Sequence, residues 1–132
     1  MRTRTTLTIA LLALALAGCG GESDAEGERV TPAQATAEIA TIETMLDTAL
    51  AQYRRGQVKA ADRTVGDAYL EHFERVEDPL GERDHELMEA LEHRIATEIR
   101  ERMKDRAPSA AVAALVADTK RDLDAAAAAL RE

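Results

Sequence analysis

Apolar side chains recur at intervals of three and four residues along most of this 132-residue chain, as in Ile39, Ile42, Leu46 and Ala49. This spacing lines one face of an α-helix, whereas a half-buried β-strand alternates apolar and polar residues. Only 2% of the residues are aromatic, and the chain is rich in Ala, Leu, Glu and Arg, which lose little conformational freedom in a helix. We therefore predict an all-α fold.

Helix-capping residues mark where the first helical segment begins and ends. Thr31 is placed as its N-cap, with Pro32 at the first helical position and Gln34 at the capping-box position. Gly56 is well placed as the C-terminal cap, because glycine adopts the left-handed conformation without a steric cost. A first helix is therefore predicted between these signals.

Three further segments carry the same periodicity. The second covers about 57–76 and is stopped by the stretch 78–81, which contains a proline and a glycine. Asp84 is placed to cap the third helix, which ends before Pro108, and Ser109 is placed to cap the fourth.

Short connections between four amphipathic helices favour an up-down-up-down four-helix bundle over residues 31–132, because each apolar face needs a partner. The alternative is a single helical hairpin whose flanking helices dock onto a partner protein. The aromatic residues Tyr53, Tyr69 and Phe73 all lie where the end of the first helix would meet the second. We expect them to form one dense layer of the core.

The N-terminal residues have the features of an export signal. Arg2 and Arg4 precede an apolar run over 7–17, which is too short to cross a bilayer as a permanent helix. The motif Leu16-Ala17-Gly18-Cys19 resembles the lipobox of bacterial lipoproteins, which implies cleavage before Cys19 and attachment of acyl chains to it. An ordinary secretory signal with an incidental cysteine is the alternative.

The chain accordingly divides into a lipoprotein signal peptide over 1–18, a lipidated flexible tether over 19–30 and a helical domain over 31–132. Acyl chains would hold the protein on a membrane outside the cytoplasm, in the cell envelope or periplasm. Because Cys19 is the only cysteine, disulfides within the chain are excluded. The formal net charge of −8 opposes binding to the phosphates of nucleic acid, so nucleic acid is a poor partner and we expect none.

Carboxylates and imidazoles gather around the predicted turn between the second and third helices. Carboxylate oxygens together with imidazole suit iron, manganese or zinc. Candidate metal ligands are Glu74, Glu77, His85 and Glu89, and the last two share a helix face because they are four residues apart. The alternative is a solvated face, since acidic pairs at this spacing are common by chance in so charged a chain.

Other chemistries lack parts that they require. His72 falls on the predicted core face, where a buried neutral histidine with one hydrogen-bond partner is the usual explanation. No Cys-x-x-Cys-His haem motif, phosphate-binding glycine loop or activated nucleophile is found, and Glu82-x-x-His85 is the only Glu-x-x-His motif. We predict that the chain is not an enzyme.

The stretch from Tyr69 to Leu80, with the Leu-rich helix that follows, resembles the extracytoplasmic helical domain of bacterial high-affinity iron permeases. The positions that match the pattern of that family are Tyr69, Leu70, Phe73, Glu74, Val76 and Glu77. The membrane portion with its Arg-Glu-x-x-Glu helices is missing, so transport by this chain alone is excluded.

What the resemblance implies is a membrane-tethered accessory of iron uptake, which collects iron or docks onto a permease. An envelope interaction protein that binds no metal is the alternative from a different functional class.

Overall fold

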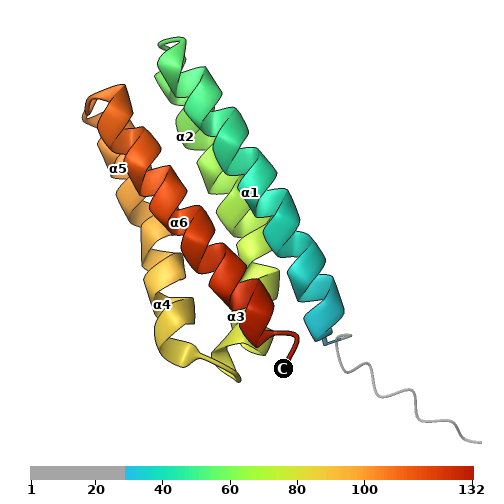
Figure 1. The fold of residues 1–132 in the computed structure, drawn as a ribbon. Helices are drawn as coiled ribbons and strands as arrows, with labels where there is room; N and C mark the ends of the chain where they lie inside the picture. Colours follow the sequence, from blue (N-terminus) through green and yellow to red (C-terminus); the bar gives the residue numbers. More distant parts are fainter. Residues whose placement is uncertain (1–28) are drawn as a thin grey trace, which may run out of the picture.

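The computed structural model describes residues 29–132, which fold entirely into helices and short turns, with no strand in that range (Figure 1). The elements are α1 (Pro32–Arg54), α2 (Val58–Asp67), η1 (Ala68–Phe73), α3 (Glu74–Gly81), α4 (His85–His93), η2 (Arg94–Glu98), α5 (Ile99–Lys104) and α6 (Ser109–Ala129). The all-α prediction is confirmed. The predicted signal peptide, Cys19 and most of the tether lie outside the described residues.

The elements η1 and η2 are π-helical turns that join their neighbours into longer helical stretches. They connect α2 to α3 and α4 to α5 without a break, because the backbone stays helical across each junction. A π turn has i→i+5 hydrogen bonds and accommodates one residue more than a regular turn. Four helical stretches therefore follow one another, over 32–54, 58–81, 85–104 and 109–129.

The side chains buried in the second stretch show where the π turn is needed. The core side chains of this stretch are three or four residues apart, except for the gap of five from Ala68 to Phe73, which coincides with η1; they are Ala61, Val65, Ala68, Phe73, Val76 and Leu80. In the third stretch, Leu91, Ile95 and Ile99 are each four residues apart and fully buried. Because four residues exceed a regular turn of about 3.6, such a row drifts around the helix unless the helix is locally underwound. The turn η2 supplies that underwinding.

The second stretch is longer than predicted, because it does not stop after Val76 but continues to Gly81 with Pro79 inside the helix. Proline lacks the N–H that would donate to the preceding turn, but its fixed φ is compatible with a helix. Pro79 and Leu80 are both buried, and Leu80 is fully so. Burial of a leucine side chain stabilises by about 2 kcal/mol, which offsets much of the cost of about 3 kcal/mol that proline imposes inside a helix.

Most of the predicted helix ends are confirmed. The Thr31 hydroxyl accepts from the Gln34 amide, and the Gln34 side chain accepts from the Thr31 amide at 2.8 Å, which completes the capping box. Gly56 has φ 76°, and the Gln57 amide donates to the Gln52 carbonyl at 3.0 Å, as in a Schellman motif. Asp84 caps α4 by accepting from the Leu87 amide at 3.0 Å.

The prediction that Ser109 caps the last helix is wrong. Ser109 is the first residue of α6, and Pro108 occupies the N-cap position without a side-chain hydrogen bond. The Pro108 carbonyl accepts from the amides of Ala111 and Val112 at 2.8 and 3.2 Å. Because the first helical turn already closes on Pro108, Ser109 has helical geometry and its hydroxyl does not take the capping role.

The core lies between helices that pack side by side, with α1 against both α2 and α6, and α2 against α5 (Figure 1). Fully buried large side chains fill it: Phe73, Ile42, Leu46, Leu80, Leu91, Ile95, Ile99, Met103, Leu123, Val65, Val76 and Val112. No helix within residues 29–132 is both long enough and apolar enough to cross a membrane.

The predicted aromatic layer forms only in part. The Tyr69 and Phe73 rings stack with their centroids 6.2 Å apart, whereas the Tyr53 hydroxyl donates to the Ala107 carbonyl at 2.6 Å. His72, next to Phe73, contacts Glu38 on α1, and Glu38 lies 15 residues before Tyr53. At 1.5 Å per residue, Tyr53 is about 22 Å along α1 from that level. Antiparallel packing of α1 and α2 separates residues that the linear order suggested were neighbours.

Candidate functional site

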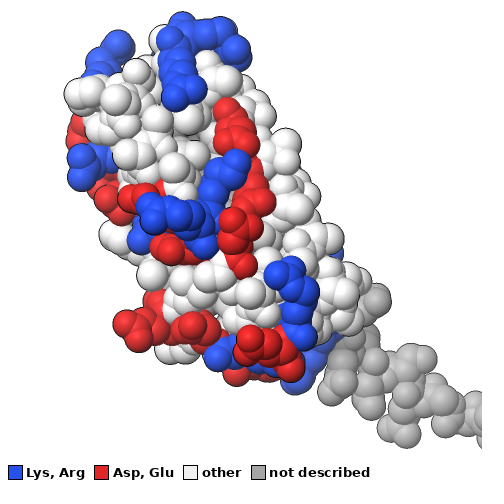
Figure 2. All heavy atoms as spheres, viewed as in Figure 1, with Lys and Arg blue, Asp and Glu red and all other residues white. Residues whose placement is uncertain are grey.

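A pocket of about 640 Å³ lies where α3 and α4 meet the N-terminal end of α1. We call it the acidic-end pocket. Its charged lining comprises Glu74, Glu77, Asp78, Glu82, Glu92, Arg29, Arg75, Arg83 and His85. Acidic side chains gather at this end of the molecule in the space-filling view (Figure 2). The lining is thus a set of carboxylates from two consecutive helices, with arginines between them.

Glu77 is a pocket residue whose carboxyl group is shifted by its surroundings. Its Oε1 atom is buried and has no hydrogen-bond partner within residues 29–132. Burial raises the pKa of this carboxyl, and the negative charges of Glu92, Glu74 and Asp78 raise it further. Contact with the Tyr69 hydroxyl acts in the opposite direction, but does not prevent the net rise of the pKa.

Tyr69 shares this environment from the neighbouring π turn. Burial, followed by the charges of Glu77 and Glu92, raises the pKa of its hydroxyl to about 12. The hydroxyl therefore keeps its proton at neutral pH and can donate a hydrogen bond towards Glu77. Both shifts have the same two causes, which are burial first and then the negative charges of neighbouring carboxylates.

Three of the four predicted metal ligands line the same pocket. Glu74, Glu77 and His85 do so, whereas Glu89 is not part of the lining. The His85 Nε2 atom lies 3.3 Å from Glu89 Oε1, but both side chains are largely exposed, at 70% and 65%. Within the part of the chain that the structure describes, no three His, Cys, Asp or Glu side chains are placed to hold a metal ion. Cys19 lies outside that part.

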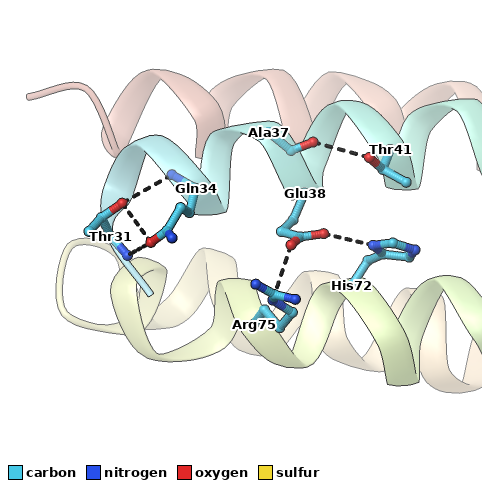
Figure 3. Close-up of polar contacts among 7 residues, drawn as sticks. All are labelled: Thr31, Gln34, Ala37, Glu38, Thr41, His72 and Arg75. Carbon is cyan, nitrogen blue, oxygen red and sulfur yellow. Dashed lines mark hydrogen bonds and ion pairs between the residues drawn. The ribbon is translucent and has the colours of Figure 1, made fainter. Parts of the chain in front are cut away.

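A second polar cluster connects α1 to η1 and α3 (Figure 3). The Glu38 carboxylate accepts from His72 Nδ1 at 2.7 Å and pairs with Arg75 Nε at 3.0 Å. The side chain of Glu38 is only 16% exposed. Because Arg75 also lines the acidic-end pocket, Glu38 positions one of the cations of that pocket.

The expectation of a buried His72 is wrong, although its single hydrogen-bond partner is confirmed. The side chain is 25% exposed, because the imidazole lies at the edge of the α1–η1 contact, where it reaches Glu38. A histidine in this place is partly accessible to solvent.

Sequence reasoning counted Glu92 among the acids around the turn without choosing it as a metal ligand, and it did not single out Arg75 or Glu38. A signal for Glu92 was present, since it lies four residues after Met88 and directly after Leu91, beside the apolar face of its helix. Glu38 had no such signal, because its partners are 34 and 37 residues away in the chain. Only the packing of α1 against η1 and α3 brings them together.

Comparison of the chain with known protein families, with curated proteins and with solved structures finds no match. The resemblance to the helical domain of iron permeases therefore stays a prediction.

Proposed function

We propose that this chain is a lipid-anchored extracytoplasmic protein that binds a divalent metal cation, iron first among them, in the acidic-end pocket. In this role it would be an accessory of metal uptake that delivers the ion to a membrane permease. The lipobox-like motif ending in Cys19 supports the anchor, and the pattern from Tyr69 to Glu77 supports the link to iron.

One observation carries the metal proposal, which is the buried and unpartnered Oε1 atom of Glu77 among like charges. A carboxylate oxygen that is removed from water without a hydrogen bond is costly, and negative neighbours add to that cost. A bound cation would satisfy the oxygen and neutralise the surplus charge at once. Fe²⁺, Mn²⁺ and Zn²⁺ all accept carboxylate and imidazole ligands.

Metal binding would require side-chain rotations in this pocket. As the side chains lie, no group of three ligands is assembled within residues 29–132. Glu74 is exposed, and Glu77 and Glu92 are partly exposed, so the three carboxylates have room to turn towards one ion. The proposal takes the domain to be an up-down-up-down bundle, which the short turns and the packing of α1 on α2 and α6 support.

The second candidate is an envelope interaction protein without a metal. It is favoured by the same lack of an assembled ligand group and by the mixed charge of the pocket, where Arg29, Arg75 and Arg83 accompany the acids. Such a lining could receive a polar segment of a membrane partner.

Calorimetric titration of the full-length chain in mild detergent with Fe²⁺ under anaerobic conditions, then with Mn²⁺ and Zn²⁺, separates the two candidates. We expect saturable heat in the parent chain and a loss of at least tenfold in affinity for Glu77→Gln, because a neutral amide removes one anionic ligand.

The matched control is Glu101→Gln, which removes the same charge at an exposed position outside the pocket. It should bind as the parent does. Heat that is absent from the parent for all three metals rejects metal binding and leaves the interaction protein. Equal affinity in the Glu77 and Glu101 variants would place the metal elsewhere.

A further inference from the structure

The turns α1–α2 and α5–α6 meet at the end of the domain opposite the acidic-end pocket. The Tyr53 hydroxyl of α1 donates to the Ala107 carbonyl between α5 and α6 at 2.6 Å, which ties the two turns together. A shallow hollow of about 440 Å³ lies between them, and Gly56, Lys59, Arg63 and Arg106 contribute to its lining. The two turns thus form one continuous surface.

This surface is densely basic, and we call it the basic end. It comprises six exposed cations: Arg54, Arg55, Lys59, Arg63, Lys104 and Arg106. None of the six makes an ion pair with any residue in 29–132. Figure 2 shows basic side chains at the end of the molecule remote from the acidic cluster.

The cations elsewhere in the domain are largely paired with carboxylates. Arg75 pairs with Glu38, Arg100 with Asp62 and Lys120 with Asp47. A chain with a net charge of −8 has carboxylates to spare for its arginines. Six cations without an ion pair on one surface, with only Asp105 between Lys104 and Arg106 as an exposed acid of the α5–α6 turn, are an uneven distribution of charge that self-repulsion opposes.

Arg106 adds an independent observation. Its φ is 55°, a left-handed conformation that glycine adopts freely and that residues with a Cβ disfavour. Gly56 occupies the corresponding place in the α1–α2 turn, with φ 76°. An arginine therefore stands beside the hollow at a position where glycine would relieve backbone strain. Strain of this kind is found preferentially at functional positions.

We propose that the basic end binds an anionic phospholipid surface through the phosphates of its headgroups. Guanidinium and ammonium groups are the usual phosphate ligands of proteins. Cations spread over the tips of two adjacent turns match a planar array of phosphates, because each can contact a different headgroup. The hollow between Lys59, Arg63 and Arg106 gives one phosphate three cationic neighbours.

The position of the N-terminus indicates which surface is reached. Arg29, Val30 and Pro32 line the acidic-end pocket, so the chain enters the domain at the end opposite to the basic one. The 23 residues of α1 span about 35 Å between these ends. A chain held by its N-terminus, as the proposed function has it, therefore presents the basic end to a second membrane surface. Binding of phospholipid itself does not depend on that anchor.

A vesicle-bridging experiment with the full-length chain tests the proposal. The chain is loaded onto phosphatidylcholine vesicles and mixed with fluorescent acceptor vesicles, made of phosphatidylcholine alone or of an equimolar mixture with phosphatidylglycerol. Co-flotation of the acceptors is measured at low and high salt. If the chain does not load onto the first vesicles, the fraction of the chain that floats with each kind of acceptor vesicle is measured instead. The dependence of binding on lipid charge is therefore measured in either case.

We expect capture of the phosphatidylglycerol vesicles only, with capture falling as salt rises. Each cation near an anionic surface contributes about fivefold in affinity, so the triple variant Lys59→Gln/Arg63→Gln/Arg106→Gln should lose about one-hundredfold. The control Lys120→Gln/Arg121→Gln/Arg131→Gln removes the same charge from α6 and its C-terminal end and should retain capture. Circular dichroism of both variants verifies the helix content.

Four results would overturn the proposal. Equal capture of neutral acceptors, or equal losses in both triple variants, would show that the basic end has no special role. Abolition of capture by inorganic phosphate, but not by chloride of the same ionic strength, would assign the hollow to a free anion. Clustering of the loaded vesicles without acceptors would indicate pairing of the basic end of one copy with the acidic end of another.

Discussion

Replacing Arg106 by glycine should stabilise the domain while weakening its basic end. Arg106 follows α5 with φ 55°, and its amide donates to the Met103 carbonyl at 3.1 Å. The next amide, of Ala107, donates to the Arg102 carbonyl at 3.0 Å. These bonds close the helix in the same way as those around Gly56, so a glycine would fit the same backbone without rearrangement.

The magnitude follows from two opposing contributions. The left-handed conformation costs a residue with a Cβ roughly 1–2 kcal/mol, which glycine does not incur. Glycine in turn loses more backbone freedom on folding, which costs roughly 0.5–1 kcal/mol. The net gain for Arg106→Gly is about 0.5–1 kcal/mol. For a domain near 100 residues this raises the unfolding midpoint by about 3–6 °C.

Thermal unfolding followed by circular dichroism measures this difference on the full-length chain. Arg106→Ala is the matched control, because it removes the guanidinium but keeps the Cβ, and it should leave the midpoint near that of the parent. A midpoint for Arg106→Gly that is equal to or below that of Arg106→Ala would refute the reasoning, since it would mean that the backbone carries no strain at this position. The vesicle assay should show weaker capture in both variants.

Four further outcomes are expected. Gly56→Ala should destabilise the domain by about 1 kcal/mol in urea unfolding, because alanine resists φ 76°, and an unchanged midpoint would contradict this. Tyr53→Phe removes the hydrogen bond to Ala107 and should cost about 1 kcal/mol in the same assay, whereas no loss would mean that this bond does not fix the two turns. Phe73→Ala empties a fully buried site and should cost about 3–5 kcal/mol; a smaller loss would indicate a core that collapses around the gap. Glu77→Gln should be more stable than the parent at neutral pH without metal. The raised pKa of Glu77 means that the destabilisation by its charge is absent below the ordinary pKa of 4.5 and develops as pH rises above it. The difference between the two chains should therefore vanish on acidification, and a constant difference would exclude this cause.

The features that sequence reasoning predicted well are local ones. The Thr31 capping box, the Asp84 cap and the left-handed Gly56 each depend on residues within one helical turn. Apolar periodicity likewise places Ile42 and Leu46 in the core without knowledge of the helix that covers them. Such signals depend only on residues that are near one another in the sequence, so they can be recognised without knowledge of the tertiary structure.

The errors arise where tertiary packing outweighs a local preference. Pro79 is a strong stop signal, but burial of Leu80 continues the helix past it. Tyr53 and Tyr69 lie near each other in the sequence. Their helices run antiparallel, however, so the two side chains lie at different positions along the helix axes. Rules based on local sequence do not include the contacts with a partner helix, and these contacts determine both outcomes.

The candidate site shows the same division. Glu74, Glu77 and His85 come to one pocket because the short α3–α4 connection forces their helices together. Glu89 has favourable spacing from His85, but that spacing orders residues along a helix face and does not turn the face inward. Glu38 pairs with Arg75 of the pocket only because α1 packs against α3. The sequence around Glu38 therefore gives no signal of this role.

The π turns η1 and η2 make the two middle helices tolerant of changes in chain length. Removing one residue from η1, such as the 60% exposed Leu70, would convert the π-helical turn into a regular α-helical turn. The residues before and after it would keep their facing towards α1, because the π turn absorbs the change in phase. These turns are therefore sites where the gene could gain or lose a single codon during evolution. Both halves of the helical stretch would keep their apolar faces towards the core.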